Sequence, residues 1–175
     1  LLADGKPGGE VYLAAGSREQ ASICFNQCRD FVRGNPTLSK RLKIIEYKKL
    51  IIDPVTGSIL RALAADGALA HGLNPTAIIA DELHIWEGKR GRELWEALQT
   101  GFGTREEPLL LCISTAGYDR ASLFYEVYEH AKKVQEGKVK DDSFLPWLYE
   151  ADPDDDWLSP ETWKKANPAL GEFRS

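Results

Sequence analysis

The sequence predicts an α/β fold in which helices cover a mostly parallel sheet. Short apolar segments alternate with segments of helical periodicity along most of the chain. Residues 77–80 and 109–113 are apolar at consecutive positions rather than at alternate ones. Such runs are typical of strands buried on both faces, as in parallel sheets. The alternation of strands with helices predicts the same class of fold.

Composition and charge exclude some classes of protein. The chain has 175 residues, 43% of them hydrophobic and 28% charged, which is enough for a sizeable core. No apolar run approaches the ~20 residues of a membrane span, so no membrane partner is expected. Three cysteines form no disulfide framework, which indicates a reducing cytosol. The net charge of −5 comes from the C-terminal part, and the near-neutral remainder shows no strong footprint for nucleic acid.

The first strand and helix are predicted at residues 10–15 and 17–32. Ser17 and Gln20 fit a capping box, in which both side chains satisfy free amides at the start of the helix. Residues 34–36, Gly-Asn-Pro, are expected to end it. Cys24 and Cys28 lie one turn apart in this helix, and without further ligands they are interpreted as core residues rather than a metal site.

The rest of the chain continues the alternation. A turn is expected at Pro54–Gly57 and a break at the acidic, proline-containing residues 152–156. A short helix should begin with Ser159 as its cap and Pro160 as its first residue. The other strands are predicted at 43–47, 50–53, 58–64, 77–81, 109–113 and 144–149, and the other helices at 90–99 and 121–135.

Two acidic residues follow the apolar run at 77–80. A strand that ends in Asp81 and Glu82 places carboxylates at the carboxyl edge of a sheet, where open α/β sheets bind ligands. Asp81 could hold Mg²⁺ through a water, and Glu82 could orient or deprotonate a water that attacks a phosphate. The alternative is an ordinary strand end with two solvated acids, since this pattern alone is common.

A second strand end favours the catalytic interpretation. Ser114 and Thr115 follow the strand at 109–113, and one helix separates them from Asp81 and Glu82. Parallel strands joined by one crossover helix end on the same edge, so both groups are expected to face one crevice. Ser114 and Thr115 could then sense the γ-phosphate of ATP or the attacking water.

These motifs together resemble the ATPase domain of the large terminase subunit of tailed bacteriophages. The resemblance rests on residues 78–86, IIADELHIW, and on residues 110–117, LLCISTAG. Residues 11–21 are similar to the segment after the family's phosphate-binding loop, and residues 166–171 to the stretch that leads toward its nuclease domain. The similarity covers nearly the whole chain in order.

The resemblance implies a P-loop NTPase of the RecA/ASCE type, a three-layer sandwich that here lacks its N-terminal part. It implies that Asp81 and Glu82 are the Walker B pair, with Asp81 as the Mg²⁺ ligand and Glu82 as the catalytic carboxylate. Ser114, Thr115, Ala116 and Gly117 match the motif that couples ATP hydrolysis to DNA movement. Residues 1–150 would be the ATPase core, and residues 151–175 an acidic linker and short helix toward an absent nuclease domain.

The resemblance also implies partners and a location. Terminases assemble as rings on the portal protein, work with a small terminase subunit, and drive double-stranded DNA into a procapsid. They act in the cytoplasm of the infected bacterium or are encoded by a prophage. The family therefore implies ATP and Mg²⁺ as cofactors and an ATPase as the enzyme.

The chain departs from the family pattern in two places. No G-x-x-x-x-G-K-[ST] motif occurs in the 175 residues, so this chain alone is expected to hydrolyse ATP poorly or not at all. Relatives often carry Arg-Gly shortly before the Walker B strand, where this chain has His71 and Gly72. Arg61 and Arg105 are the remaining candidates for an arginine finger, although a solvated surface role suits each better.

Several other residues have an ordinary interpretation beside a functional one. His84 could link nucleotide state to a neighbouring element, but a half-exposed histidine after a strand is more common. The five tryptophans could include one that stacks on DNA, but most are expected to pack in the interior. Asp154, Asp155 and Asp156 are expected to form a solvated loop rather than a nuclease metal site.

Two other classes of protein remain open. Asp81–His84 also fits the D-E-x-H signature of helicases, although a helicase should continue into an Arg-rich motif where this chain turns acidic. A non-catalytic α/β assembly module with a decayed site is the other alternative, and it would not bind nucleotide even within the full-length protein.

Overall fold

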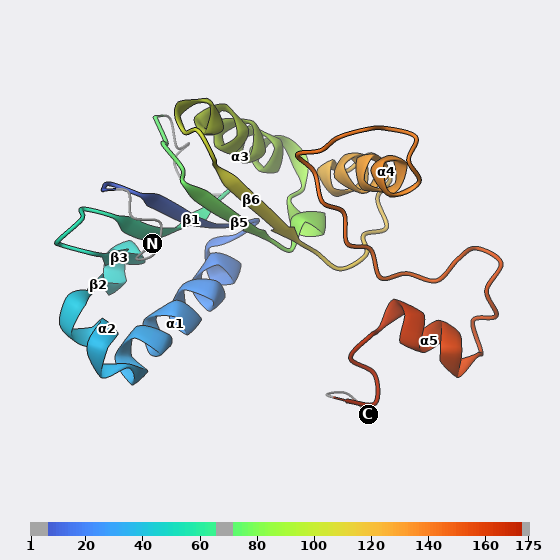
Figure 1. Cartoon of the computed structure of the whole chain (residues 1–175), viewed down its shortest axis with the longest axis horizontal. Helices are drawn as coiled ribbons and strands as arrows, with labels where there is room; N and C mark the ends of the chain where they lie inside the picture. The colour runs from blue at the N-terminus through green and yellow to red at the C-terminus, as the bar shows by residue number, and fades with distance from the viewer. Residues whose placement is uncertain (1–6, 66–71, 173–175) are drawn as a thin grey trace. The chain divides into compact units, whose positions relative to one another are not determined.

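The computed structural model of the chain describes residues 7–65 and 72–172. The chain divides into two compact units between Glu126 and Val127, inside helix α4 (Leu123–Gln135). The first unit contains the sheet and the predicted site (Figure 1). The division into an ATPase core at 1–150 and a linker at 151–175 stays a prediction about function.

The first unit is built on a six-stranded sheet with the order β2-β3-β4-β1-β5-β6. Strands β4, β1, β5 and β6 are parallel neighbours, whereas β2 and β3 join as an antiparallel pair. This mixed, mostly parallel sheet confirms the predicted α/β class. The strands are β1 (Glu10–Ala15), β2 (Lys43–Ile45), β3 (Leu50–Ile52), β4 (Ile59–Ala64), β5 (Ala77–Asp81) and β6 (Leu109–Ile113).

The strand register brings four chain segments to one edge of the sheet. Ala15 of β1 pairs with both Ala64 and Asp81, and Asp81 in turn pairs with Ile113. The four parallel strands therefore end level with one another, as the crossover argument predicts. The residues that follow each strand end meet at this carboxyl edge.

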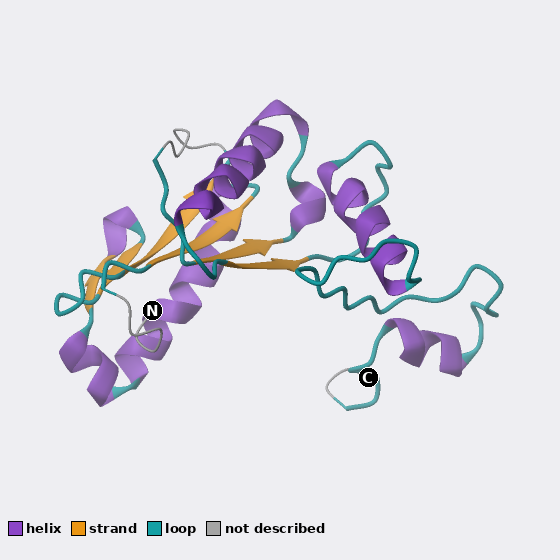
Figure 2. Ribbon diagram, turned by 45° about the horizontal axis from the view of Figure 1, so that its top comes forward, coloured by secondary structure: helices purple, strands orange, loops and turns teal. Residues whose placement is uncertain are grey.

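Helices cover both faces of the sheet. Helix α1 (Arg18–Gly34) and helix α3 (Gly88–Gly101) lie on opposite faces in both views (Figures 1 and 2). Phe25 and Val32 of α1 pack with Leu13 and Ile51 in one core cluster, and Cys24 and Cys28 pack against it as expected. Helix α3 buries Leu94, Trp95 and Leu98. The result is the three-layer arrangement that the sequence predicts.

One short helix was not predicted from the sequence. Gly34-Asn35-Pro36 was expected only to end α1, but Asn35 also begins helix α2 (Pro36–Arg41). The Asn35 side chain accepts hydrogen bonds from the amides of Thr37 and Leu38, and Pro36 occupies the first helical position. Asparagine and proline favour helix starts as strongly as chain breaks, so the pattern alone was ambiguous.

A close backbone contact fixes the start of α3. Trp86 is 2% exposed, and its indole contacts Trp95 edge to face at 6.3 Å between ring centroids. A Cβ added to Gly91 would lie 2.5 Å from the carbonyl oxygen of Trp86. Only glycine allows this approach, because the neighbouring atoms are backbone and cannot rotate away.

We therefore expect Gly91→Ala to destabilise the chain by about 1–3 kcal/mol, since either α3 or the turn before it must shift. Urea unfolding followed by circular dichroism measures this change. Gly34→Ala is the matched control, because a Cβ there meets nothing within 4 Å. Equal midpoints for Gly91→Ala and the wild type would show that α3 does not depend on this contact.

The second unit contains the end of α4, an extended segment and helix α5 (Pro160–Ala166). Ser159 caps α5 and Pro160 is its first residue, as predicted. The predicted strand at 144–149 is wrong: these residues form no strand, although Leu145, Trp147 and Tyr149 alternate as exposed side chains along it. The apolar alternation is present, but the described chain offers it no hydrogen-bonded neighbour.

Two further expectations for the second unit need correction. Trp147, Trp157 and Trp163 are exposed, so packing accounts only for Trp86 and Trp95. The acidic loop is also less free than expected, because Lys165 pairs with Asp155 at 2.7 Å and with Asp152. The ion pairs tie this loop to α5.

Candidate functional site

The candidate site lies where β5 ends. Asp81 is the last residue of the strand, and Glu82 follows it with φ +51° and ψ +54°. A residue other than glycine rarely adopts this left-handed conformation, and such strain concentrates at functional sites. The turn is held by the Trp86 indole, which donates to the Asp81 carbonyl at 3.0 Å. The chain thus turns sharply after Asp81, and the two carboxylates contact different neighbouring segments.

Helix α1 holds the Asp81 carboxylate from one side. Gln20 Nε2 and Cys24 Sγ donate to the same oxygen, Oδ2, at 3.1 and 3.2 Å. The other oxygen, Oδ1, accepts no hydrogen bond from the described residues. The carboxylate is therefore oriented through one oxygen and offers the second to a ligand.

This arrangement changes the interpretation of the two α1 residues. The Ser17 hydroxyl caps the helix by accepting from the Gln20 amide at 3.2 Å, as predicted, but the Gln20 side chain bonds Asp81 instead of closing the capping box. Burial, with a smaller contribution from the neighbouring Asp81 carboxylate, raises the pKa of the Cys24 thiol to about 11. A thiol that keeps its proton can act as the donor to Asp81.

Glu82 is held by the residues that follow β6 and by His84. Its Oε2 lies 3.1 Å from His84 Nδ1, and it accepts from the Thr115 amide and hydroxyl, each at 3.4 Å. No described residue bonds the other oxygen, Oε1. Both carboxylates of the predicted pair are therefore anchored through one oxygen and open at the second.

His84 joins the two strand ends. Its amide donates to the Ser114 hydroxyl oxygen at 3.1 Å, and its Nδ1 lies 3.2 Å from the same oxygen. A Cβ on Gly117 would lie 3.2 Å from the Cβ of His84, so these backbones also approach closely. The ordinary interpretation of His84 as a half-exposed histidine is incomplete, because the side chain bridges both motifs.

The predicted site residues are thus brought together, with one exception. Asp81, Glu82, Ser114 and Thr115 lie at one edge. Thr115 bonds Glu82, His84 bonds Ser114, and Gly117 lies against His84. Ala116 is exposed beside them without a contact that gives its side chain a role. Gln20, Cys24 and His84 complete the arrangement.

The donor set fits Mg²⁺ bound together with phosphate. In the described part of the chain, no group of three or more His, Cys, Asp or Glu side chains could hold a metal by itself. Mg²⁺ does not need such a cage, since it keeps several waters and uses one or two carboxylates plus substrate phosphates. The open oxygen of Asp81 would supply such a carboxylate.

Neither arginine considered as a finger belongs to this cluster. Arg105 donates to the Gly8 carbonyl at 2.8 Å, at the opposite edge of the sheet, where β1 begins. Arg61 lies inside β4, two strands away from β5. His71 falls outside the described residues, and its neighbour Gly72 adopts φ +80°.

The parallel sheet and the two carboxylates at the carboxyl end of β5 are the arrangement found in α/β domains that bind nucleotides. A family model for the ATPase domain of the terminase large subunit matches residues 1–133. The large terminase subunit of Enterobacteria phage HK97 is 36% identical over 166 residues, which cover 95% of this chain. The chain therefore belongs to the family of terminase large subunit ATPase domains.

Solved structures agree with this assignment. The crystal structure of the HK97 large terminase matches 99% of this chain with a TM-score of 0.83 and 32% identity. The match to the ATPase domain of the Thermus phage P74-26 large terminase covers 70% of this chain and 53% of that domain's chain, with a TM-score of 0.51 and 20% identity. At this identity the match supports the fold alone. YmfN of Escherichia coli K12 is 32% identical over 100 residues, or 57% of this chain and 21% of its own.

The chain spans about a third of the HK97 relatives, 32% of the sequence and 35% of the solved chain. No helix among residues 7–65 and 72–172 is both long and apolar enough to cross a membrane.

Proposed function

We propose that the chain supplies the Mg²⁺-binding and water-orienting half of the ATP site in a phage DNA-packaging motor. The observation that carries this proposal is the paired geometry of Asp81 and Glu82. Each carboxylate is anchored through one oxygen and open at the other, at the same edge as Thr115. Mg²⁺, when bound with ATP, neutralises charge on the transferred phosphoryl group.

The chain's own residues divide the work. Gln20 and Cys24 orient Asp81 so that its free oxygen can hold a water of the metal or the metal itself. Glu82 accepts a proton from the attacking water or orients that water, which requires its free oxygen to face the phosphate. Thr115 and His84 contact the other oxygen of Glu82. Loss of the γ-phosphate would therefore be transmitted through Glu82 to the segment after β6.

The phosphate-cradling loop must then come from the rest of the full-length protein. Strand β6 is the edge strand of the sheet, and Leu109, Leu111 and Ile113 are 62%, 46% and 50% exposed on it. An open, apolar edge of a parallel sheet is a place where another strand pairs. We place a strand that leads into that loop on β6, next to Ser114.

The remaining parts of the proposal follow from the family. The motor would act on double-stranded DNA in the cytoplasm of the infected bacterium, as a ring on the portal protein and with a small terminase subunit. A separate nuclease domain of the full-length protein would cut the DNA. The family match favours this function over the helicase and over the non-catalytic module.

Hydrolysis of ATP by the full-length protein and by residues 1–175 alone tests the proposal. We expect Mg²⁺-dependent hydrolysis by the full-length protein, and a rate near background for residues 1–175, because the phosphate-binding lysine is absent from them. Asp81→Asn in the full-length protein should raise the Mg²⁺ concentration for half-maximal activity by roughly 10-fold or more. Asp142→Asn is a matched control, because the Asp142 side chain is 84% exposed and lies outside the site. An unchanged Mg²⁺ requirement for Asp81→Asn would argue against the metal role.

A further inference from the structure

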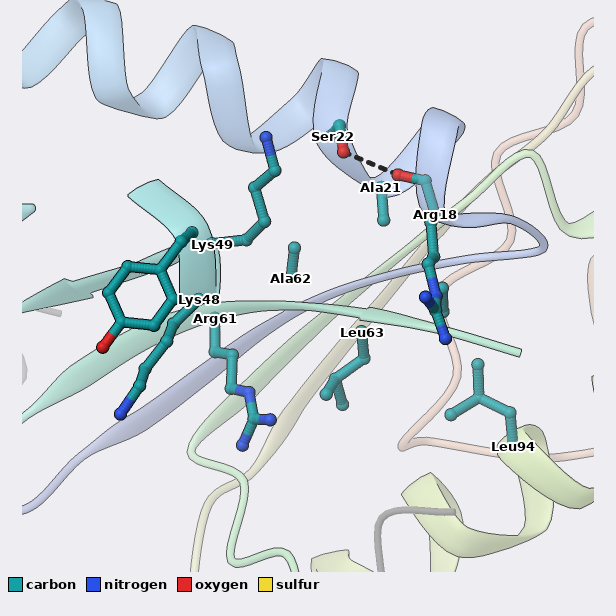
Figure 3. Close-up of a pocket in the computed structure, with 11 residues that line it drawn as sticks. Arg18, Ala21, Ser22, Lys48, Lys49, Arg61, Ala62, Leu63 and Leu94 are labelled. Carbon is teal, nitrogen blue, oxygen red and sulfur yellow. Dashed lines mark hydrogen bonds between the residues drawn. The ribbon is translucent and has the colours of Figure 1, made fainter. Parts of the chain in front are cut away.

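A pocket of about 380 Å³ lies beside β4, apart from the Asp81–Glu82 cluster (Figure 3). Its walls come from α1, β4, α3 and the short turn of 3₁₀ helix η1 (Glu46–Lys48). Four cationic side chains line it and no Asp or Glu does: they are Arg18, Lys48, Lys49 and Arg61. We call this the basic pocket. Such a concentration of charge stands out in a chain with a net charge of −5.

Three cations of the basic pocket lack a carboxylate partner. Several other cations of the first unit are paired with carboxylates, for example Arg41 with Asp53 and Arg92 with Glu126. Lys48, Lys49 and Arg61 form no ion pair with the residues that the structure describes. Cations left without a counter-charge create a positive potential that attracts anions.

The local fold holds these side chains in place. Strand β3 pairs with β4 only from Ile59 to Arg61, so the rest of β4 is open on that side. The amide of Ala62 bonds the Lys49 carbonyl at 3.0 Å, which attaches the turn to the strand. Lys49 itself adopts φ +48°, a strained conformation that is kept despite its cost. In Figure 3, Arg18, Lys48 and Arg61 extend to one side of β4 and Lys49 to the other.

We propose that the basic pocket binds the phosphodiester backbone of DNA. Arginine and lysine bind phosphate oxygens through charge-assisted hydrogen bonds. Arg18, Lys48 and Arg61 come from three separate segments and extend to the same side of β4, which suits a chain of phosphates better than a single anion. The inference rests on the proposed function, since a packaging motor has a polyanion as its cargo.

The residues that line the basic pocket also indicate whether its DNA binding depends on base sequence. The lining contains no Asn or Gln, which read the edge of adenine, and no Asp or Glu, which read that of cytosine. Contacts to phosphates position a protein on DNA without reading its sequence. The basic pocket therefore binds DNA independently of sequence and with a strong dependence on salt, as a motor that moves along any DNA requires.

Fluorescence anisotropy of a labelled DNA duplex with the full-length protein tests the proposal. The variant is Lys48→Ala with Arg61→Gln, because these two side chains extend to the same side of β4. Affinity should fall roughly 10-fold or more at low salt, and the slope of log affinity against log salt should become shallower by about 2. A second duplex of unrelated sequence should give the same values.

The charge-matched control is Lys138→Ala with Lys140→Ala, whose side chains are 69% and 86% exposed. It removes the same charge and should leave DNA affinity within about 2-fold. Thermal melting of both variants establishes that each remains folded. The proposal is overturned if the pocket variant binds DNA with the affinity of the wild type. It is also overturned if the pocket variant and the control lose affinity to the same extent.

Two further outcomes are decisive. Competition by ATP or inorganic phosphate, at concentrations that leave ionic strength unchanged, would assign the basic pocket to a small anion and overturn DNA binding. Hydrolysis of ATP by the wild-type protein without DNA is measured separately and decides the proposed function. If the protein binds DNA through this pocket but hydrolyses no ATP, DNA binding at the basic pocket is supported and the proposed motor function is refuted.

Discussion

Glu82→Gln in the full-length protein is expected to lower kcat for ATP hydrolysis by at least about 100-fold. Glutamine keeps the size of the side chain and the contacts of Oε2 with Thr115, but it cannot accept a proton from water. The Mg²⁺ and phosphate contacts are made elsewhere, so KM should change by no more than a few-fold. Steady-state phosphate release, with ATP binding measured by filter retention, gives both values.

Glu87→Gln is the matched control for this variant. Glu87 is exposed at the start of α3 and makes no side-chain capping bond, so its replacement should leave kcat within about 2-fold. A Glu82→Gln protein that hydrolyses ATP at the wild-type rate would remove Glu82 from the chemistry. The strained turn at position 82 would then need a structural explanation.

The second large effect is on stability, at Asp53. Its side chain is 0% exposed, and its oxygens accept from Arg41 at 2.6 Å, from the Val55 amide at 3.0 Å and from the Thr56 hydroxyl at 3.1 Å. Asp53→Asn removes the counter-charge of Arg41 and replaces one buried acceptor oxygen by an amide nitrogen that cannot accept these hydrogen bonds. We expect the melting temperature to fall by roughly 10 °C, since breaking a buried pair is strongly destabilising.

The same pair predicts how stability depends on pH. The hydrogen bond from Arg41 holds the pKa of Asp53 below its usual value, with smaller contributions from Val55 and Thr56. A carboxyl whose pKa is lower when folded stabilises the protein above its unfolded pKa of about 4 and loses that contribution as pH falls. The difference in melting temperature between wild type and Asp53→Asn should therefore shrink below about pH 4.

Asp30→Asn separates this effect from surface charge. Asp30 pairs with Arg29 at 2.8 Å, but its side chain is 58% exposed, so the change in melting temperature should be small. Differential scanning fluorimetry from pH 3 to 8 measures all three proteins. Equal losses for Asp30→Asn and Asp53→Asn would contradict the importance of burial at Asp53.

The sheet and the main site residues could be predicted because their signals are local. Apolar runs in the sequence indicate β5 and β6 directly. Asp81 comes immediately after the first run, and Ser114 comes immediately after the second. Parallel connection through one helix then places both ends on one edge, whatever the details of packing. The position of these residues could therefore be predicted from the topology of the sheet, without knowing any side-chain contact.

The supporting residues could not be predicted because their roles depend on packing. Gln20 and Cys24 are spaced four apart, which puts them on one face of α1, but nothing in their own segment shows that Asp81 faces them. The His84 bridge likewise requires the exact turn after β5, which the positive φ of Glu82 creates. The cations of the basic pocket come from three separate segments of the chain, and no local sequence pattern indicates that they lie together.

The central claim is that Asp81 and Glu82 are the metal-binding and water-orienting carboxylates of an ATP site. A crystal structure of the full-length protein with Mn²⁺ and a non-hydrolysable ATP analogue, with anomalous scattering to locate the metal, tests it most directly. We expect Mn²⁺ within direct or single-water reach of the free oxygen of Asp81, with the γ-phosphate between Glu82 and Thr115. Metal and nucleotide bound at another place, with Asp81 and Glu82 in contact only with solvent, would contradict the account.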